Sequence, residues 1–477
     1  MTAPPRFAPL ALAALLAACA SPGAIAPAAT PRPATEVGLQ DTADHAALVT
    51  PTWWTAFGDP QLDALVGRAL ADNPGLKAVD ARARKAAAAV AGARAEEAPR
   101  VDGSLDATRQ RYTENGLYPP PIAGSVQTSA NLQATLHWDL DFFGRNRAAL
   151  AAAIGAERAA AAETAAARLQ LTGNVARGYV GLARLLEQRR IAERSLAQRD
   201  EVLSLVRQRV GAGLDTNVEL RQAEGALPEV RAQIEALDEQ IALARHALAA
   251  LSAQPPAALD ALAPELRAVH AVDVPAALPV DLLGQRADVS AARWRVEAAT
   301  QDVAQARTLF YPNVDLMAFV GLNSFGLDRL LRAGSENFGV GPALRLPLFD
   351  AGRLRANLRG RTADLDAAVE SYNAAVLDAV RDAADQIASL QSVGRQQGEQ
   401  AAAQGAAESA YDLALQRYRA GLGTYLVVLT AETNVLAQRR AAAELKARAL
   451  DAQVALARAL GGGYRDAPTL AARTEQQ

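Results

Sequence analysis

The 477-residue chain contains a single cysteine, Cys19, so an intramolecular disulfide is excluded. Its four histidines are scattered along the chain, and their spacing does not resemble that of metal ligands. Met1 and Met317 are the only methionines, which argues against a methionine-lined path for copper or silver. We therefore expect no bound metal and no cofactor.

Motifs for enzyme chemistry and for nucleic-acid binding are also missing from the sequence. The chain has no P-loop, no HExxH and no GxSxG motif. Its formal net charge of −3 gives no electrostatic reason for nucleic-acid binding. After the N-terminal segment, no run of about twenty apolar residues could form a transmembrane helix. These absences predict a protein that is not an enzyme and does not bind nucleic acid.

The N-terminal segment is predicted to be a lipoprotein signal peptide over residues 1–18. A short apolar stretch ends in Leu16-Ala-Ala-Cys19, which resembles a bacterial lipobox, so Cys19 is the expected site of lipid attachment. An ordinary signal peptide with an incidental cysteine is the alternative. Residues 19–50 are rich in Ala, Pro and Thr and predict a lipidated, flexible tether. Ala20 is not the aspartate associated with inner-membrane retention, so the expected address is the outer membrane.

Two long, proline-free helices are predicted at about residues 146–209 and 354–417. Both stretches are alanine-rich, with apolar residues at mixed spacings of three and four. At about 1.5 Å per residue, each helix would be a rod of roughly 100 Å. Such a rod must bury its apolar stripe against other rods, as coiled coils do.

The two long helices belong to a tandem repeat. Late in each unit, matching residues stand 208 positions apart (421 − 213 = 208), and earlier they stand 213 apart (312 − 99 = 213). The recurring pairs include Pro99/Pro312, Arg209/Arg417, Gly213/Gly421 and Thr216/Thr424. We assign residues 51–252 to the first repeat, 253–285 to a Pro/Ala-rich connector, 286–463 to the second repeat and 464–477 to a C-terminal tail.

Each repeat contains two predicted strands, because the apolar period changes to two. The clearest strand is 126–138, with Leu132 and Leu136 on an apolar face and Gln133 and Thr135 on a polar face. The other strands are expected at 101–111, 312–322 and 337–348.

These strand lengths suit the roughly 9–11 residues that cross a bilayer at a tilt. Half-buried strands of a soluble sheet are the alternative. Four strands cannot close a barrel, so copies of the chain would have to pool their strands. The strand count allows a dimer with eight strands or a trimer with twelve.

The turns that follow the two long helices are the candidate functional site. Each turn pairs a glycine suited to the C′ position of one helix with a threonine suited to the N-cap of the next. A leucine lies between them in both copies, although a hairpin end that faces only water gains nothing from it. The alternative is that these residues only make the turn. The six residues are Gly213, Leu214 and Thr216 in the first turn and Gly421, Leu422 and Thr424 in the second.

Taken together, these features resemble the outer-membrane factor family, the TolC-like exit ducts of efflux and secretion systems, and especially its lipidated, NodT-type branch. The matching motifs are the lipobox ending at Cys19, Trp54-xx-Phe57-x-Asp59-Pro60-x-Leu62, Asn73-Pro74-x-Leu76, Gly144-Arg145, Phe349-Asp350-x-Gly352-Arg353 and the stretch 459–463. The chain departs from the family at Arg286-Ala287-Asp288, where Arg-Pro-Asp is usual. It also has Val427 and Thr430 where some members carry aspartates that ring the closed periplasmic mouth.

The resemblance implies a mainly α fold with a transmembrane β part. Three copies would form a homotrimer, in which a 12-strand β-barrel in the outer membrane continues into a 12-helix α-barrel that extends into the periplasm. The implied function is passive export of drugs or other toxic small molecules, driven by an inner-membrane resistance-nodulation-division (RND) transporter through a periplasmic adaptor. In the family the hairpin tips resemble the docking surface for that adaptor.

Two alternatives to this function remain open. The first is the outer-membrane duct of a type I protein secretion system. The second, from a different class, is a periplasmic coiled-coil lipoprotein or enzyme.

Overall fold

The computed structural model describes residues 21–33, 36, 49–266 and 285–465. The predicted lipobox at Cys19 and most of the predicted C-terminal tail lie outside the described residues. Spatial proximity divides the chain into two compact units. The first unit comprises residues 1–31, 83–160 and 292–372, and the second comprises 32–82, 161–291 and 373–477.

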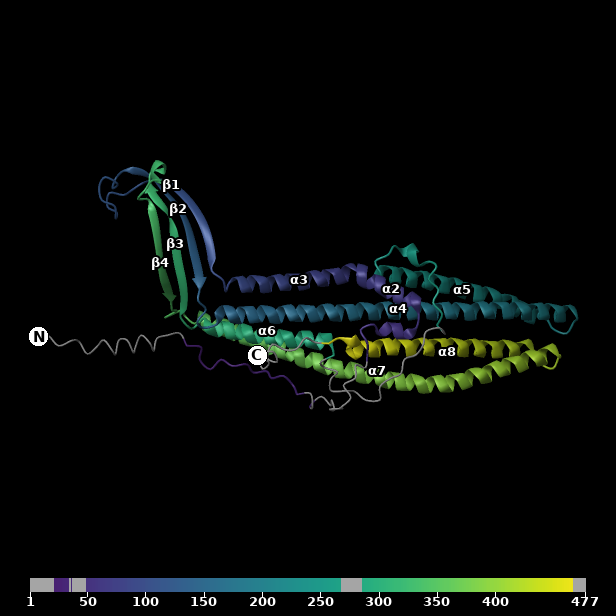
Figure 1. Ribbon diagram of the computed structural model, residues 1–477. Helices are drawn as coiled ribbons and strands as arrows, with labels where there is room; N and C mark the ends of the chain where they lie inside the picture. Colours follow the sequence, from purple (N-terminus) through teal and green to yellow (C-terminus); the bar gives the residue numbers. More distant parts are fainter. Residues whose placement is uncertain (1–20, 34–35, 37–48, 267–284, 466–477) are drawn as a thin grey trace. The chain divides into compact units, whose positions relative to one another are not determined.

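The six longest helices form three pairs of equal length (Figure 1). The pairs are α3 (Pro74–Ala95) and α6 (Ala287–Thr308), with 22 residues each; α4 (Arg145–Gly211) and α7 (Arg353–Arg419), with 67 each; and α5 (Asn217–Leu251) and α8 (Tyr425–Ala459), with 35 each. The predicted long helices at 146–209 and 354–417 are therefore confirmed to within two residues. Among the described residues, no helix combines the length and the apolar character that crossing a membrane requires.

The first α-helix after the predicted tether begins at the Asp59-Pro60 pair of the family motif. In α2 (Pro60–Asp72), Pro60 occupies the first turn, and the carboxylate of Asp59 caps the helix by accepting a hydrogen bond from the Gln61 amide at 2.9 Å. The other oxygen of Asp59 accepts a 2.6 Å hydrogen bond from the hydroxyl of Tyr179, and both side chains are buried. The Asp59 carboxylate therefore both caps α2 and links it to α4 by a hydrogen bond.

Four strands form one antiparallel sheet in the order β1-β2-β3-β4 (Figure 1). Their bounds are β1 Arg100–Arg111, β2 Val126–Asp139, β3 Asn313–Phe325 and β4 Glu336–Arg345. Strands β1 and β2 form one hairpin and β3 and β4 form another, and β2 pairs with β3 to join the two hairpins, with Leu132 opposite Leu322. Strands β1 and β4 are the two edges of the sheet.

The register places most of the apolar side chains of the four strands on one face of the sheet. Opposite residues of an antiparallel pair lie on the same face, so partners form rows across the sheet. One row runs Leu105, Leu132, Leu322 and ends at Glu336, and another runs Gly103, Ala134, Val320, Phe338. The alternating row Ser104, Gln133, Gly321, Asn337 lies on the other face and is polar.

The fourth strand ends earlier than the sequence pattern predicts. The alternation of apolar and polar residues continues to Leu348, but β4 ends at Arg345 in the structure. The predicted end of this strand, at residue 348, is therefore wrong. Pro347 explains the difference, because proline has no N–H for the ladder and restricts the backbone of the residue before it. Strand β3 extends three residues past the predicted end, to Phe325.

Part of the segment predicted to be a flexible tether lies against α7. The Ala28 and Ala29 amides both donate to one carboxylate oxygen of Asp366, each at 2.9 Å. A few residues later, the Arg32 amide donates to the side-chain oxygen of Asn373 at 2.9 Å. The composition of the segment did not predict these contacts. Unpaired N–H groups of an extended, proline-rich chain remain free to form hydrogen bonds with side chains of a neighbouring helix.

Each unit has its own apolar core. In the first unit, Phe310, which lies just before β3, packs with Leu354, Leu358 and Leu365 of α7. There α4 and α6 approach so closely that a Cβ on Gly155 would lie 3.0 Å from the Ala298 backbone nitrogen.

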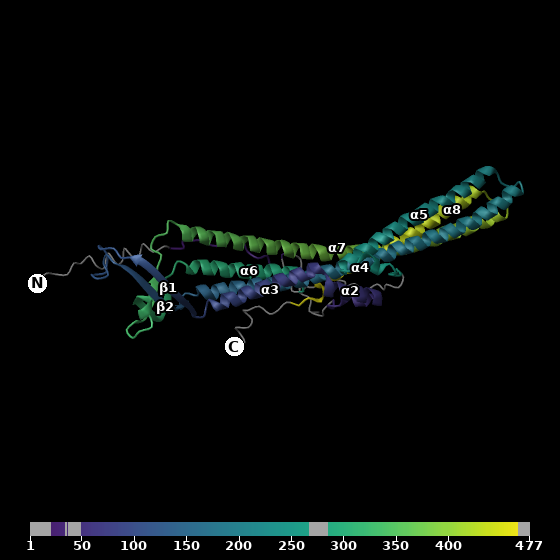
Figure 2. The same cartoon turned by 90° about the horizontal axis from the view of Figure 1, so that it is seen from above.

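In the second unit, side chains of α2, α4, α5 and α8 form one large cluster. The two views of this unit in Figures 1 and 2 show the hairpins α4–α5 and α7–α8 side by side. The fold therefore brings the two predicted turns to the same end of this unit.

Candidate functional site: the paired hairpin turns

Both long helices end in the same backbone motif. Gly213 and Gly421 have φ values of +73° and +74°, as predicted for a C′ position. The Leu214 amide donates to the Arg209 carbonyl at 2.9 Å, and the Leu422 amide donates to the Arg417 carbonyl at 2.8 Å. These bonds, together with those from the glycine amides, make a Schellman motif at each end. Substituting either glycine would force an L-residue into a strained left-handed conformation.

The helices that follow the turns are capped differently. At α5 the Thr216 hydroxyl accepts from the Val218 amide at 3.1 Å, and the Glu219 carboxylate accepts from the Thr216 amide at 2.9 Å. These two bonds form a capping box, with Thr216 at the predicted N-cap. Thr424 occupies the N-cap of α8 with an extended backbone, but its side chain makes no capping hydrogen bond. The prediction is therefore only half right for Thr424: it stands at the N-cap, but the Val427 amide donates to its carbonyl oxygen at 3.2 Å and not to its hydroxyl.

The two predicted leucines are exposed at the hairpin ends. Leu214 is 64% exposed and Leu422 is 71% exposed. Val218 on α5 and Leu426 on α8 are also exposed beside them. Both hairpin ends therefore expose large apolar side chains.

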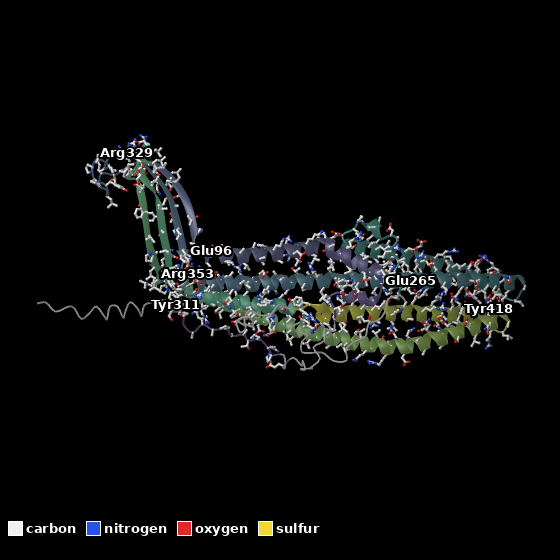
Figure 3. All side chains as sticks on the ribbon, in the orientation of Figure 1. Glu96, Glu265, Tyr311, Arg329, Arg353 and Tyr418 are labelled. Atoms are coloured by element: carbon white, nitrogen blue, oxygen red, sulfur yellow. The ribbon has the colours of Figure 1, made fainter. Side chains whose placement is uncertain are left out.

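Three further side chains connect the two hairpins, and sequence reasoning did not select them. The Tyr418 hydroxyl donates to Asp215 at 2.5 Å, and the Arg209 guanidinium donates to the same carboxylate at 2.9 Å. Arg209 also donates to the Tyr418 carbonyl at 3.1 Å and lies 4.7 Å from the centre of the Tyr418 ring. Figure 3 labels Tyr418 at the hairpin ends. We call Arg209, Asp215 and Tyr418 the tip link.

The tip link is polar but well shielded, since the Arg209 and Asp215 side chains are only about a tenth exposed. Burial alone would raise the pKa of the Asp215 carboxyl. Hydrogen bonds from Arg209 and Tyr418, with the attraction of the Arg209 charge, outweigh burial and hold that pKa below its ordinary value. Burial and the bond to Asp215 raise the pKa of Tyr418. Asp215 is therefore ionised and Tyr418 neutral at neutral pH.

A signal for this link was present in the sequence. The two turns match at Gly, Leu and Thr but differ between Asp215 and Gly423, and the first turn alone carries a carboxylate. The difference becomes meaningful only when the hairpins are seen together, because Asp215 receives its hydroxyl partner from 203 residues away.

A second polar connection lies farther along the hairpins. Buried Glu432 on α8 accepts hydrogen bonds from Ser195 at 3.1 Å and from Arg199 at 3.0 Å, both on α4. Arg199 also donates to the Ala226 carbonyl on α5 at 3.0 Å. Because Ser195 and Glu432 are buried and Arg199 is only partly exposed, removing one partner would leave another unpaired, which makes this connection expensive to break.

The position expected for a carboxylate gate is apolar. Val427 and Thr430 line a groove of about 590 Å³ between α7 and α8, together with Leu426 and three alanines of α7. No side chain that lines this groove carries a charge.

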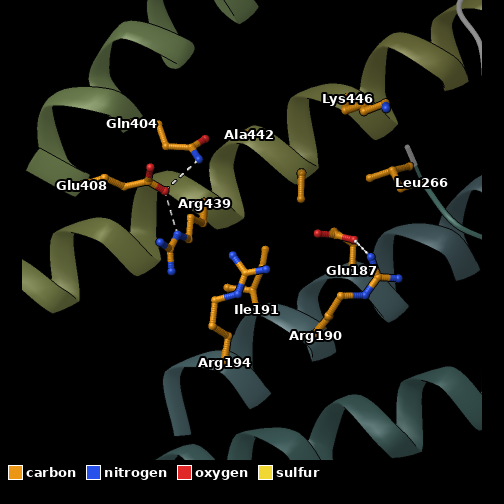
Figure 4. Close-up of a pocket in the computed structure, with 11 residues that line it drawn as sticks. Glu187, Arg190, Ile191, Arg194, Leu266, Gln404, Glu408, Arg439, Ala442 and Lys446 are labelled. Atoms are coloured by element: carbon orange, nitrogen blue, oxygen red, sulfur yellow. Dashed lines mark hydrogen bonds and ion pairs between the residues drawn. The ribbon is translucent and has the colours of Figure 1, made fainter. Parts of the chain in front are cut away.

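A smaller cavity, of about 300 Å³, lies between α4 and the hairpin α7–α8 (Figure 4). Four of its charged lining residues form two ion pairs, Arg190 with Glu187 at 2.8 Å and Arg439 with Glu408 at 2.9 Å, and Arg194 and Lys446 also line it. Among the described residues, no group of His, Cys, Asp and Glu is arranged to hold a metal ion. These ion pairs connect side chains within and between helices. Their arrangement does not resemble that of a nucleophile and its general base.

Comparison with known proteins identifies the family. The profile of the outer membrane efflux protein family matches residues 65–254 and 278–462. The multidrug resistance outer membrane protein MdtP of Shigella flexneri is 35% identical over 433 residues, which cover 88% of this chain and 87% of that protein. The fusaric acid resistance protein FusA of Burkholderia cepacia is 39% identical over 312 residues, 64% of this chain but only 58% of that protein.

Solved structures agree with the sequence matches. The outer membrane protein VceC of Vibrio cholerae is 36% identical, with a TM-score of 0.82, and the match covers 87% of this chain and all of that one. The outer-membrane channel OprN is 27% identical, with a TM-score of 0.81 over 93% of this chain. The family match, the relatives and the fold lead to one assignment: the chain belongs to the outer membrane efflux protein family.

Proposed function

We propose that this protein is the passive outer-membrane exit channel of a tripartite efflux pump. An inner-membrane RND transporter would supply the energy, and a periplasmic adaptor would connect the two. The observation that carries the proposal is the sheet, whose apolar face presents Val101, Leu105, Val320, Phe338 and Val340 well exposed in the single chain. A soluble protein would not leave a four-stranded apolar face open to water, whereas a lipid bilayer would cover it.

The edges of this sheet require strands from other copies of the chain, and we propose a homotrimer because the family resemblance implies one. Strands β1 and β4 each have one side without a strand partner among the described residues, and open edges are not tolerated in lipid. Three copies would supply twelve strands and close a barrel, and two copies would supply eight. The equal lengths of the paired helices support a tandem repeat. Three chains with two similar repeats each would then form a tube of twelve helices with nearly sixfold symmetry.

The hairpin ends suit a gated docking surface. We infer that Leu214 and Leu422, exposed on adjacent turns, contact the adaptor. The tip link would hold the two hairpins together in a closed state and would have to break for them to part. The site would then couple docking to opening.

The names of the relatives favour small molecules as the exported substrates. MdtP and FusA are named for resistance to drugs and to fusaric acid. A duct for type I protein secretion is the second candidate, and it predicts the same trimer with a different pump. A periplasmic spacer or enzyme is the third, and it predicts no pore.

The decisive experiment reconstitutes the purified protein in planar lipid bilayers. We expect trimers that resist SDS without heating and that give ion conductance. A folded monomer without conductance would contradict the channel proposal. Drug susceptibility of a strain in which this protein is the sole outer-membrane channel, compared with its export of a protein substrate, separates efflux from secretion.

A further inference from the structure

The cavity of about 300 Å³ between α4 and the hairpin α7–α8 lies within the second unit (Figure 4). On α4 the other lining residues lie three, four and seven positions after Glu187, and on α8 they lie at the same intervals after Arg439. Residues at these intervals share one face of a helix, so α4 and α8 each present one face to the cavity. Neither the family assignment nor the proposed transport path gives this cavity a role.

Positive charge exceeds negative charge in the lining of this cavity. Four basic residues and two glutamates line it. Each glutamate, Glu187 and Glu408, is bound by one arginine in the ion pairs described above. The other two basic residues are Arg194 and Lys446, and their side chains form no hydrogen bond or ion pair within the part of the chain that the structure describes. The cavity therefore has two positive charges that its own carboxylates do not balance.

The unbalanced charges lie at the two ends of the cavity. Arg194 lies at the end where Arg439 binds Glu408 (Figure 4). The hydrogen bond from Arg439 is the main reason that the pKa of the Glu408 carboxyl is lowered, and the charge of Arg194 contributes to the same shift. At the other end, burial lowers the pKa of the Lys446 ammonium against the attraction of Glu187. Each end therefore holds more positive than negative charge.

Arg439 also has a donor without an acceptor. Its Nε donates to Glu408 at 2.9 Å, but its Nη1 is buried and has no hydrogen-bond partner within the described residues. Buried polar groups in proteins normally have a partner, so this nitrogen indicates an acceptor supplied by another molecule. A neutral acceptor would satisfy the N–H group alone, whereas an anion would also balance the charge of Arg194. An anion therefore accounts for both observations.

The rest of the lining restricts the kind of anion. Ile191, Leu266 and Ala443 are buried and line the cavity beside the charged groups. An inorganic ion would gain nothing from these side chains, whereas an organic acid would bury its apolar body against them. A carboxylate also matches the planar guanidinium group, which can donate two parallel hydrogen bonds to it. The lining therefore suits a small organic acid in its ionised form.

We propose that this cavity binds a small organic carboxylate, with Arg194 and the Nη1 of Arg439 as the donors to its carboxylate group. Ile191 and Leu266 contact its apolar body, and Lys446 supplies the second positive charge. Arg194 belongs to α4 and Arg439 to α8, so the bound ligand connects the hairpins α4–α5 and α7–α8. The site does not depend on the proposed transport function, because all its groups come from one unit of one chain.

The test measures binding of benzoate to the purified full-length protein in mild detergent, by isothermal titration calorimetry at constant ionic strength. Benzamide, a neutral molecule of the same shape, should not bind, and acetate, which lacks the apolar ring, should bind more weakly than benzoate. A charge-assisted hydrogen bond changes affinity by about tenfold or more, so Arg194→Gln should weaken benzoate binding by that factor. Arg448→Gln, at an exposed position of α8 outside the cavity lining, is the matched control and should bind as the wild type does.

Arg194 is exposed, so its substitution should leave the fold intact, and the melting temperature without benzoate checks this. Arg194→Lys keeps the charge, and its affinity should lie between those of the wild type and Arg194→Gln. Absence of binding by the wild type, equal benzoate binding by wild type and Arg194→Gln, or benzamide binding as tight as that of benzoate would overturn the proposal. Inorganic phosphate that binds more tightly than benzoate would reject the organic ligand. Conductance of the same samples tests the channel proposal separately.

Discussion

At the scale of single residues, a few polar side chains connect helices that the sequence places far apart. Asp59 joins α2 to Tyr179, and Asp215 joins the first hairpin to Tyr418. Each carboxylate accepts more than one hydrogen bond, so its charge is satisfied where it is buried. Asp215, which is satisfied in this way, and Asp451, which is not, give predictions with opposite pH dependence.

We expect Asp215→Asn to loosen the tip link. The amide keeps the shape of the side chain but removes the charge that Arg209 and Tyr418 bind, and each charge-assisted bond is worth about 1.5–3 kcal/mol. Conductance in planar bilayers should rise in the variant, while Asp412→Asn, an exposed site on α7, should behave as wild type. Unchanged conductance at normal trimer level would show that the tip link does not restrict the channel.

The pH dependence of the tip link follows from the lowered pKa of Asp215. A carboxyl whose folded pKa is depressed stabilises the fold above its unfolded pKa and loses that contribution as the pH falls through the folded value. The tip link should therefore survive from neutral pH down to the ordinary Asp value of 3.8 and weaken only below it. An increase in conductance between pH 7 and pH 5 that Asp215→Asn abolishes would contradict this assignment.

Asp451 on α8 should behave in the opposite way. Burial raises its pKa to about 6, against the attraction of Arg177 and Arg184, and one of its carboxylate oxygens is buried without a hydrogen-bond partner in the described structure. A raised pKa means that folding is favoured while the group is protonated and that stability falls as the pH rises through about 6.

Asp451→Asn should therefore raise the melting temperature at pH 7.5 by about 1–3 °C. At pH 4.5 the difference should largely disappear, since the native carboxyl is then protonated. Thermal unfolding at the two pH values makes the measurement, with exposed Asp200→Asn as the control. A larger gain at the acidic pH would reverse the sign and reject the assignment.

At the scale of whole elements, alternation along each strand and register across the strands combine into one surface. Leu132 lies between Leu105 and Leu322 on the apolar face, while its neighbour Gln133 lies on the polar face. Because the two residues are adjacent in sequence, they would lie at nearly the same depth in a membrane. Substitutions at these two positions therefore test which face of the sheet meets lipid.

Leu132→Lys should impair assembly far more than Gln133→Lys. A lysine on a lipid-facing site near the midplane costs about 2–4 kcal/mol, whereas a lumen-facing lysine costs little. The yield of SDS-resistant trimers in the outer membrane measures the effect. Equal yields for the two variants would mean that the apolar face does not meet lipid.

The helical hairpins carry the docking prediction. Leu214→Asp with Leu422→Asp changes two exposed side chains and leaves the Schellman bonds in place, so the trimer should fold and insert. Adaptor crosslinking and drug export should both fall. Leu413→Asp, exposed on α7 below the turn, is the matched control. Normal resistance in the double variant at normal protein level would leave the two turns with a structural role only.

At the scale of the whole molecule, three pairs of helices with equal lengths and two strand hairpins are joined into one chain. The N-terminal segment adds a contact outside this pattern, because residues 28–32 bond to Asp366 and Asn373 on α7. Anchoring and insertion would therefore use separate parts of the chain.

Cys19→Ser should abolish acylation while the strands still insert. Trimers should persist in the outer membrane at reduced efficiency, because the sheet supplies its own membrane contact. Metabolic labelling with a radioactive fatty acid checks the first part, and the heat-modifiable band checks the second. Labelling that continues in the variant would rule out Cys19 as the lipid attachment site.

The sequence by itself determined the elements that depend on local chemistry. Helix ends at Asp59-Pro60, Gly213 and Thr216 were predictable because a cap or a positive φ is decided within a few residues. The two faces of β2 were predictable because alternation is also local. Motifs along the whole chain gave the family, which the comparisons confirm.

Tertiary structure decided what depends on partners distant in sequence. The tip link joins Asp215 to Tyr418, and the single apolar face needs β2 to pair with β3 in a register that neither strand specifies alone. The course of residues 28–32 along α7 depends on side chains more than 330 positions away. A sequence pattern records which groups can bond, but only the packed chain selects which of them meet, because burial and distance set the free energy of each contact.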